Sequence, residues 1–362
     1  MLPKLTIRGR TLDSPIIQGG MGIGVSLEPL ASTVAREGGA GIISSAALNM
    51  IFSKKHCEKI SSYDAMLEEV INARYNAQNT GAVGVNIMTY IVKDYAQSVR
   101  GAVAGGADMI ISGAGLPLQL PTLVGNANIA LIPIVSSLRA LKIIHKRWLK
   151  KGRCIDAVVV EGPLAGGHLG FKVEQINDEN FSLEKIFDPI KDFAQKNGNF
   201  PVIVAGGVYS HSDILYWIDR GANGVQMGTR FLATKESTAD DDFKAAVVNC
   251  TRDDIIISHP DTNPPGSPST MPFRLIKQSP MFCSERKSLC NKGAVLQQDK
   301  SGKYTKCLAK EEPKKHFCIC NGLMSSAGYE SREKPLWTVG SNAWRINKLL
   351  SVHELMNELK GI

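Results

Sequence analysis

Eight short apolar runs recur along the chain at wide and fairly regular intervals. They are Pro15–Gln18, Ala40–Ser44, Ala82–Asn86, Asp108–Ser112, Ala130–Val135, Asp156–Glu161, Pro201–Ala205 and Asn223–Met227. Stretches with helical spacing of apolar and charged residues lie between them, so the pattern predicts strands that alternate with helices. Such alternation predicts right-handed β-α-β units and a parallel sheet. Eight units favour a closed (β/α)8 TIM barrel over an open doubly wound sheet.

Local signals predict where some helices begin. Ser26 is expected to cap a helix that starts at Leu27, with Pro29 in its first turn. Ser351 and Glu354 form a capping-box pattern in front of an apolar stretch near the C-terminus. This pattern predicts a last helix that packs on the barrel wall.

One segment interrupts the alternation of strands and helices. From about residue 240 to residue 332 the chain is rich in Pro, Ser, Lys and Cys. We therefore predict three parts: a barrel over 1–240, an irregular insertion or lid over 241–332, and a helical segment over 333–362.

Composition and charge narrow the class of protein. The 362 residues are 43% apolar, which is enough for a large core. The N-terminus lacks the apolar core of a secretory signal, and the longest apolar runs are too short to span a bilayer, so a cytoplasmic location is expected. The net charge of +8 is scattered and aromatic residues are only 6%, which argues against nucleic-acid binding. The charge better suits an anionic cofactor, substrate or acidic partner.

Five of the eight cysteines fall within the predicted insertion, at Cys283, Cys290, Cys307, Cys318 and Cys320. They could bind zinc or an iron–sulfur cluster, in which case the barrel would be a regulatory protein rather than an enzyme. Because the spacing contains no CxxC pairs, free thiols are the favoured interpretation and no metal site is predicted.

The stretch Asp156–Phe171, DAVVVEGPLAGGHLGF, has the features of a ligand-binding strand end. Its apolar run predicts a strand buried on both faces, which ends at Glu161 and continues into a glycine-rich loop. Because glycine has no Cβ, such a loop lets a planar or phosphorylated ligand approach the backbone. The one histidine of this loop, His168, is placed to move protons near neutral pH.

The active site of a (β/α)8 barrel lies at the C-terminal ends of its strands. The loops after the seventh and eighth predicted strands offer exposed N–H groups, which is the usual phosphate site of such barrels. The residues concerned are Gly206, Gly207, Gly228 and Thr229. The glycines after the first strand and Asn86 are expected at the flat end of the same ligand. One phosphate and one planar ring describe FMN better than a dinucleotide, and no GxGxxG fingerprint follows a strand.

With these motifs the chain resembles the nitronate monooxygenase family, formerly 2-nitropropane dioxygenase. That family also includes FMN-dependent enoyl-acyl-carrier-protein reductases and NADH:quinone reductases. The resemblance rests on the motifs QGGMG, GVNIM, EGPLAGGHLG, PVIVAGGV and QMGTRFLATKES, between Pro15 and about Ser237. As a set these motifs are specific for the family and poorly specific for the substrate. The resemblance implies that the barrel over 1–240 is a TIM barrel that binds FMN without a covalent bond.

Matching positions imply roles for single residues. Gly20 and Met21 would face the flavin ring, and Asn86 would contact FMN. Glu161 stands where monooxygenase members often carry glutamine, and either side chain can accept a hydrogen bond from flavin or ribityl groups. His168 matches the active-site histidine of the family. The other expected cofactor-binding residues are Gly22, Gly166, Gly167, Gly206, Gly207, Gln226, Gly228 and Thr229.

The resemblance leaves two activities open. The favoured one is oxidation of an alkyl nitronate or nitroalkane with O2, in which His168 binds the anion as imidazolium or abstracts the α-proton of a neutral nitroalkane. The other is reduction of an enoyl thioester or a quinone with NAD(P)H, in which His168 donates a proton to an enoyl substrate. The basic charge would then suit an acidic acyl carrier protein. A homodimer is compatible with either activity.

Overall fold

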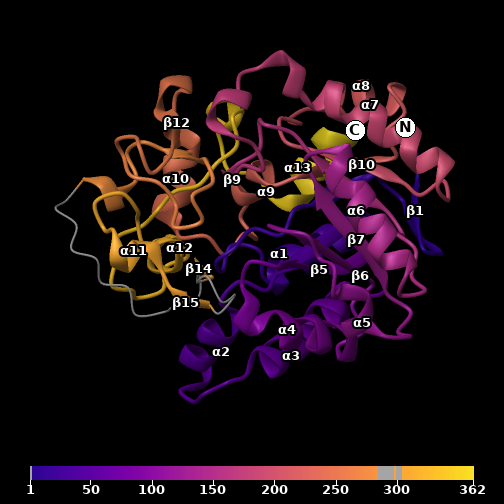
Figure 1. Ribbon diagram of the computed structural model, residues 1–362, viewed down its shortest axis with the longest axis horizontal. Coiled ribbons are helices and arrows are strands. Elements are labelled where there is room, and N and C mark those ends of the chain that lie inside the picture. Colours follow the sequence, from indigo (N-terminus) through magenta and orange to yellow (C-terminus); the bar gives the residue numbers. More distant parts are fainter. Residues whose placement is uncertain (1, 284–296, 299–303) are drawn as a thin grey trace.

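The chain folds around a closed barrel of parallel strands in the order β10-β11-β3-β4-β5-β6-β7-β8 (Figure 1). This computed structural model describes residues 2–283, 297–298 and 304–362. The barrel strands are β3 (Ile16–Gln18), β4 (Ala40–Ser44), β5 (Ala82–Met88), β6 (Met109–Gly113), β7 (Ala130–Val135), β8 (Val158–Glu161), β10 (Val202–Ala205) and β11 (Gly224–Met227). Each is one of the predicted apolar runs, so the TIM barrel is confirmed.

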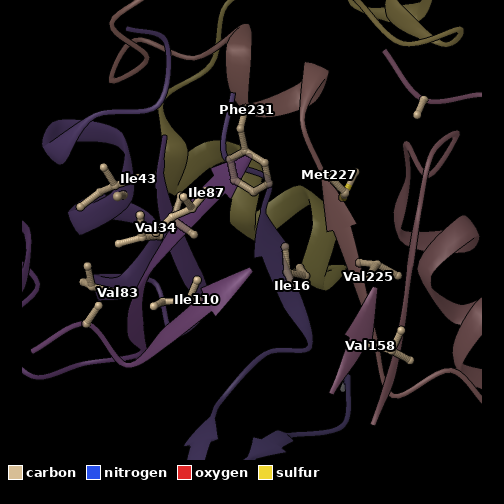
Figure 2. Close-up of a cluster of buried hydrophobic side chains, with 14 of the residues drawn as sticks. Ile16, Val34, Ile43, Val83, Ile87, Ile110, Val158, Val225, Met227 and Phe231 are labelled. Carbon is tan, nitrogen blue, oxygen red and sulfur yellow. The ribbon is translucent and has the colours of Figure 1, made fainter. Parts of the chain in front are cut away.

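The alternation of side chains along these strands creates two apolar layers. Ile17, Ile42 and Val159 belong to the cluster that fills the inside of the barrel. Their neighbours one residue along the strand face the surrounding helices and belong to a second, larger cluster. Figure 2 shows part of this outer layer, with Ile16 and Val158 among its members. Because both faces are buried, the strands are mainly apolar, and their polar residues lie toward their C-terminal ends.

Helices surround the barrel and extend beyond it. They are α1 (Glu28–Arg36), α2 (Leu48–His56), α3 (Ser62–Asn76), α4 (Val92–Ala104), α5 (Leu120–Val124), α6 (Leu138–Leu149), α7 (Leu183–Lys196), α8 (His211–Asp219), α9 (Thr229–Leu232), α10 (Asp241–Asn249), α11 (Leu308–Glu311), α12 (Ile319–Ser326) and α13 (Val352–Lys360). Short 3-10 helices are Val173–Gln175, Glu179–Phe181, Arg252–Asp254, Pro280–Phe282 and Ala343–Arg345. None of the helices that the structure describes is both long and apolar enough to cross a membrane.

One predicted cap is confirmed and one is wrong. Ser351 and Glu354 form the expected capping box of α13, which contacts α1 and α8. Ser26 does not cap α1, whose N-cap residue is Leu27. The Ser26 hydroxyl instead accepts hydrogen bonds from the side chain of Gln18 and the N–H of Met21, both at 2.9 Å. The loop that follows β3 therefore uses the hydroxyl that the helix was expected to use.

The remaining strands lie outside the barrel. The antiparallel pair β1 (Leu5–Ile7) and β2 (Arg10–Leu12) adds its apolar side chains to the inner cluster. A second sheet has the order β12-β13-β9, with β12 (Ile255–Ser258), β13 (Phe273–Ile276) and β9 (Gly167–His168). Strands β14 (Gln297–Gln298) and β15 (Tyr304–Lys306) form a further pair. The second sheet joins the 241–332 segment to the histidine loop, and the division of the chain into three parts stays a prediction.

Candidate active site

A cavity of about 500 Å³ lies at the C-terminal ends of the barrel strands. Its volume falls within the usual range of small-molecule sites. The structure brings all of the sequence-predicted site residues to its wall. They are Gly20, Met21, Gly22, Asn86, Glu161, Gly166, Gly167, His168, Gly206, Gly207, Gln226, Gly228 and Thr229. Their placement agrees with one shared site, and their individual roles stay predictions.

The register of the strands explains why three polar side chains reach this cavity. Glu161 lies directly beside Ala205 of β10, which in turn lies beside Gln226 of β11. Asn86 pairs with Ser44 of β4. Each of the three residues occupies an inward-facing position near the C-terminal end of its strand. Its side chain therefore points into the mouth of the barrel. A register shift of one residue would turn each toward the helices.

The loops after β10 and β11 present backbone donors. Gly206 and Gly207 have φ angles of +91° and +92°, which only glycine adopts without strain. Among the described residues, no acceptor is seen for the N–H groups of Gly207, Gly228 and Thr229. Unpaired N–H groups at a strand–helix junction are a typical anion site. This geometry fits the predicted role in binding a phosphate.

A loop near the C-terminus covers this end of the cavity, and the sequence analysis did not anticipate it. Gly340 donates its N–H to Thr229 Oγ1 at 2.9 Å, and the side chain of Asn342 donates to the carbonyl of Gly207. Because Thr229 Oγ1 accepts from Gly340, its own hydroxyl proton is available to a ligand in the cavity. The Val339–Asn342 loop therefore fixes the positions of Gly207 and Thr229 at the predicted phosphate site.

His168 is held between the cavity and the second sheet. Its ring lies edge-on against Phe273, with ring centroids 4.9 Å apart and planes at 86°. Its Nε2 is 2.9 Å from the hydroxyl oxygen of Ser267. Burial lowers the pKa of His168 to about 4, so the imidazole is neutral at neutral pH. The structure does not support the expectation that His168 binds an anion as imidazolium.

A buried arginine fixes the loop between β8 and His168. Arg274 of β13 donates from Nη1 to the carbonyls of Pro163, at 2.7 Å, and Ala165. No carboxylate pairs with it among the described residues, and burial lowers its pKa to about 10, which still leaves it charged. Two backbone carbonyls therefore stabilise the buried guanidinium of Arg274. The sequence analysis did not identify Arg274 as part of the site.

Glu161 gives the site a stability that depends on pH. Burial raises the pKa of Glu161 to about 7, against 4.5 for an unperturbed glutamate. Between these two values the folded chain keeps a proton that the unfolded chain has lost, so the free energy of unfolding falls as the pH rises through this window. The loss is complete above pH 7.

We therefore expect Glu161→Gln to stabilise the flavin-free protein at high pH. The gain in the free energy of unfolding should be near zero at about pH 4 and reach on the order of 2–3 kcal/mol at about pH 8. Denaturant titrations at both pH values measure it. The exposed Glu179→Gln is the control and should change stability by less than about 0.5 kcal/mol at either pH. An equal effect of Glu161→Gln at both pH values would contradict the assignment.

The cysteines of the predicted insertion do not assemble a visible metal site. Cys290 lies outside the described residues. Among the residues that are described, no group of three or more His, Cys, Asp or Glu is arranged to hold a metal ion. Cys307 and Cys318 share a small buried cluster, Cys320 lines the cavity and Cys283 is exposed.

The sequence pattern that defines the nitronate monooxygenase family matches residues 6–361. The chain belongs to this family. The resemblance read from the motifs is confirmed, and the family is one of oxidoreductases. Nitronate monooxygenase family members depend in general on a flavin.

One curated relative agrees with this membership, and two solved structures share the fold. A probable nitronate monooxygenase of Staphylococcus aureus (strain Newman) is 34% identical over 105 residues, which is 29% of this chain and 28% of the relative. FabK from Thermotoga maritima has a TM-score of 0.67 and 21% identity, over 96% of this chain and 92% of FabK. A nitroalkane oxidase from Streptomyces ansochromogenes has a TM-score of 0.65 and 17% identity, over 97% of this chain and 95% of that chain. At such identities the structural matches show a shared fold.

The residues of this member of the nitronate monooxygenase family fit a flavin. The side-chain oxygen of Gln226 is buried without a hydrogen-bond partner in the described structure, as expected for an acceptor that meets a ligand N–H or hydroxyl. A Cβ on Gly20 would lie 2.4 Å from Asn86 Cβ, which is too close for any side chain. Glycine at this position keeps the cavity wall beside Asn86 open to a planar ring. The unpaired N–H groups at Gly207 and Gly228 suit a phosphate.

Proposed function

We propose that this chain is an FMN-dependent monooxygenase that oxidises alkyl nitronates with O2. The observation that carries the proposal is the cavity itself, which has unpaired backbone donors at one side and a neutral imidazole at another. Donors for a single phosphate favour FMN among the flavins. A bound flavin supplies the electron transfer between the substrate and O2.

The residues of the protein bind the cofactor, orient the substrate and exclude water from the cavity. Gln226 and Asn86 offer polar groups to the cofactor, and Thr229 offers a hydroxyl to its phosphate. Apolar side chains such as Met21 and Phe273 line the rest of the cavity and exclude water. A mononucleotide fills most of a space of about 500 Å³, so the space that remains suits a small substrate. His168 is left to hydrogen-bond the charged oxygens of a nitronate.

The proposal is tested with FMN-loaded protein and no NAD(P)H. We expect O2 to be consumed with propionate-3-nitronate or with the nitronate of 2-nitropropane, in proportion to enzyme concentration. The control is the same preparation freed of flavin, which should show no turnover. Absence of O2 consumption with both nitronates at full flavin occupancy would rule the proposal out.

One observation favours a second candidate, an NAD(P)H-dependent reductase of an enoyl thioester or a quinone. Glu161 stands where monooxygenase members often carry glutamine, and its raised pKa of about 7 allows it to exchange a proton near neutral pH. Under anaerobic conditions NADH or NADPH would then bleach the flavin rapidly. Bleaching by NAD(P)H without nitronate oxidation would replace the first candidate with this one.

A further inference from the structure

The 241–332 segment supplies a hydrogen-bond partner to His168. Ser267 lies between β12 and β13, is completely buried, and places its Oγ 2.9 Å from His168 Nε2. The backbone of β13 also pairs with that of β9, with Phe273 opposite His168. The ring is therefore held by a strand partner, an aromatic contact and one hydroxyl.

Counting protons on Ser267 gives the direction of this hydrogen bond. A serine hydroxyl can donate one hydrogen bond and accept two. Ser267 Oγ accepts one bond from the N–H of Ser269 at 3.3 Å and a second from the Ser269 hydroxyl at 3.0 Å. The backbone N–H of Met271 can only donate, and it donates to Ser269 Oγ at 3.3 Å. The one proton left on Ser267 therefore points to His168 Nε2.

The opposite arrangement leaves a buried group without a partner. If His168 Nε2 carried the proton and donated it, Ser267 Oγ would accept three hydrogen bonds. Its own proton would then have no acceptor among the described residues, and Ser267 has no contact with solvent. Buried donors without acceptors are costly, so the network selects the neutral ring with an acceptor at Nε2.

The proton of the neutral ring must then be on Nδ1, which faces the cavity. His168 lines the cavity and keeps part of its surface exposed there. Nδ1 has no hydrogen-bond partner among the described residues, and it is not one of the buried atoms that lack one. A ligand in the cavity can therefore reach this atom.

We propose that Ser267, supported by Ser269, is a positioning residue that holds His168 in the Nδ1–H tautomer and aims this N–H at an anionic oxygen of the substrate. The part that concerns the substrate rests on the proposed function, whereas the tautomer does not. The Ser267 loop is itself fixed, because its carbonyl is 3.0 Å from His316 Nδ1 and Gly266 exchanges backbone hydrogen bonds with Lys315 and Phe317.

The tautomer can be read directly by NMR of the protein as purified, without substrate. The chain has seven histidines, and in ¹⁵N-histidine-labelled protein the His168 signals are those missing from His168→Gln. We expect long-range ¹H–¹⁵N correlations to show a protonated Nδ1 and an unprotonated Nε2 in the wild type. In Ser267→Ala the two nitrogens should move toward the averaged pattern of mixed tautomers, and in Ser267→Thr they should keep the wild-type pattern.

A second buried serine of the same segment provides the matched control. Ser258 donates to the carbonyl of Phe273 at 3.4 Å and does not contact His168, so Ser258→Ala should leave the His168 signals unchanged. If Ser267→Ala does not fold, Ser269→Ala takes its place. It removes one donor to Ser267 and should give a partial shift of the same signals.

Kinetics on nitronates should follow the tautomer. Ser267→Ala should raise KM about two- to fivefold with a smaller change in kcat, because only part of the His168 population then presents Nδ1–H to the anion, and Ser267→Thr should restore KM. A wild-type His168 protonated on Nε2, or signals that Ser267→Ala and Ser269→Ala leave unchanged, would overturn the proposal whatever the substrate. A shift in the NMR signals without nitronate turnover would instead refute the proposed function and leave the tautomer standing.

Discussion

Exchanging His168 for glutamine is expected to lower kcat/KM for nitronates by about 100-fold or more, with no change in flavin content. A glutamine amide can still accept the hydrogen bond of Ser267. It lacks the rigid ring that places a second nitrogen on the cavity side, so the donor to the substrate is lost or misdirected. The pKa of about 4 means that the wild-type His168 is neutral throughout the neutral range, so the ratio of wild-type to variant kcat/KM should not change through titration of His168 between about pH 8 and pH 6.

The measurement is initial-rate O2 consumption at several nitronate concentrations, with flavin quantified by absorbance in the same samples. His56→Gln is the matched control, because His56 is an exposed histidine at the end of α2 and does not line the cavity. It should keep wild-type kinetics. A His168→Gln variant with wild-type kcat/KM would remove His168 from the reaction.

The barrel could be predicted from sequence because each of its strands is a local signal. A strand buried on both faces is a short run of mainly apolar residues, as in Ala130–Val135, and such a run is visible without any tertiary contact. The polar residues at the strand ends could be predicted for the same reason. Once a run is assigned as a barrel strand, a polar residue at or next to its end, such as Glu161 or Gln226, is expected at the mouth of the barrel.

Competition between local and distant partners explains the wrong cap. Ser26 precedes a helix and has the right chemistry for an N-cap, which is all that the local pattern can show. In the folded chain the amide of Gln18 and the N–H of Met21 take its hydroxyl. The N–H of Glu28 is accepted by Glu69 of α3, 41 residues away. Tertiary hydrogen bonds replaced the local one.

The parts of the site that sequence reasoning missed come from distant segments. Ser267, Arg274 and Asn342 contact the cavity loops across more than 90 residues, with no motif or spacing that marks them. Ser267 lies in a Pro- and Ser-rich stretch that resembles an ordinary connection. The only available signal was indirect: a buried imidazole needs a partner, and none was offered by the EGPLAGGHLG loop. His168 could therefore be placed at the cavity from sequence, whereas the residues that contact its ring could be found only from the fold.

These contacts assign the 241–332 segment a part in the site. Arg274 holds the carbonyls before His168, Ser267 bonds the ring, and Phe273 packs on it. A segment that only covered the cavity would have no need of a buried cation and a directed chain of hydroxyls. Its contacts instead fix the histidine loop from the side opposite the barrel.

The second large effect is expected from Gly166→Ala, which should lose most of its flavin and be destabilised by about 1–3 kcal/mol. A Cβ at this position would lie 2.6 Å from the carbonyl carbon of Val339 and 2.7 Å from the nitrogen of Gly340. Both are backbone atoms, so no rotamer change relieves the clash. The loop must move, and it carries the hydrogen bonds to Thr229 and Gly207 at the predicted phosphate site.

Two readouts separate this effect from ordinary glycine strain. Gly152 has a φ of +69° with no atom within 4 Å of its added Cβ, so Gly152→Ala bears the conformational cost alone and should keep its flavin. Flavin content and denaturant unfolding of the flavin-free protein are measured for both variants. Because the clash displaces the Val339–Asn342 loop at the predicted phosphate site, Gly166→Ala should lose more flavin than its lowered free energy of unfolding alone would cause. Full flavin content in a destabilised Gly166→Ala would show that the Val339–Asn342 loop does not hold the cofactor end of the cavity.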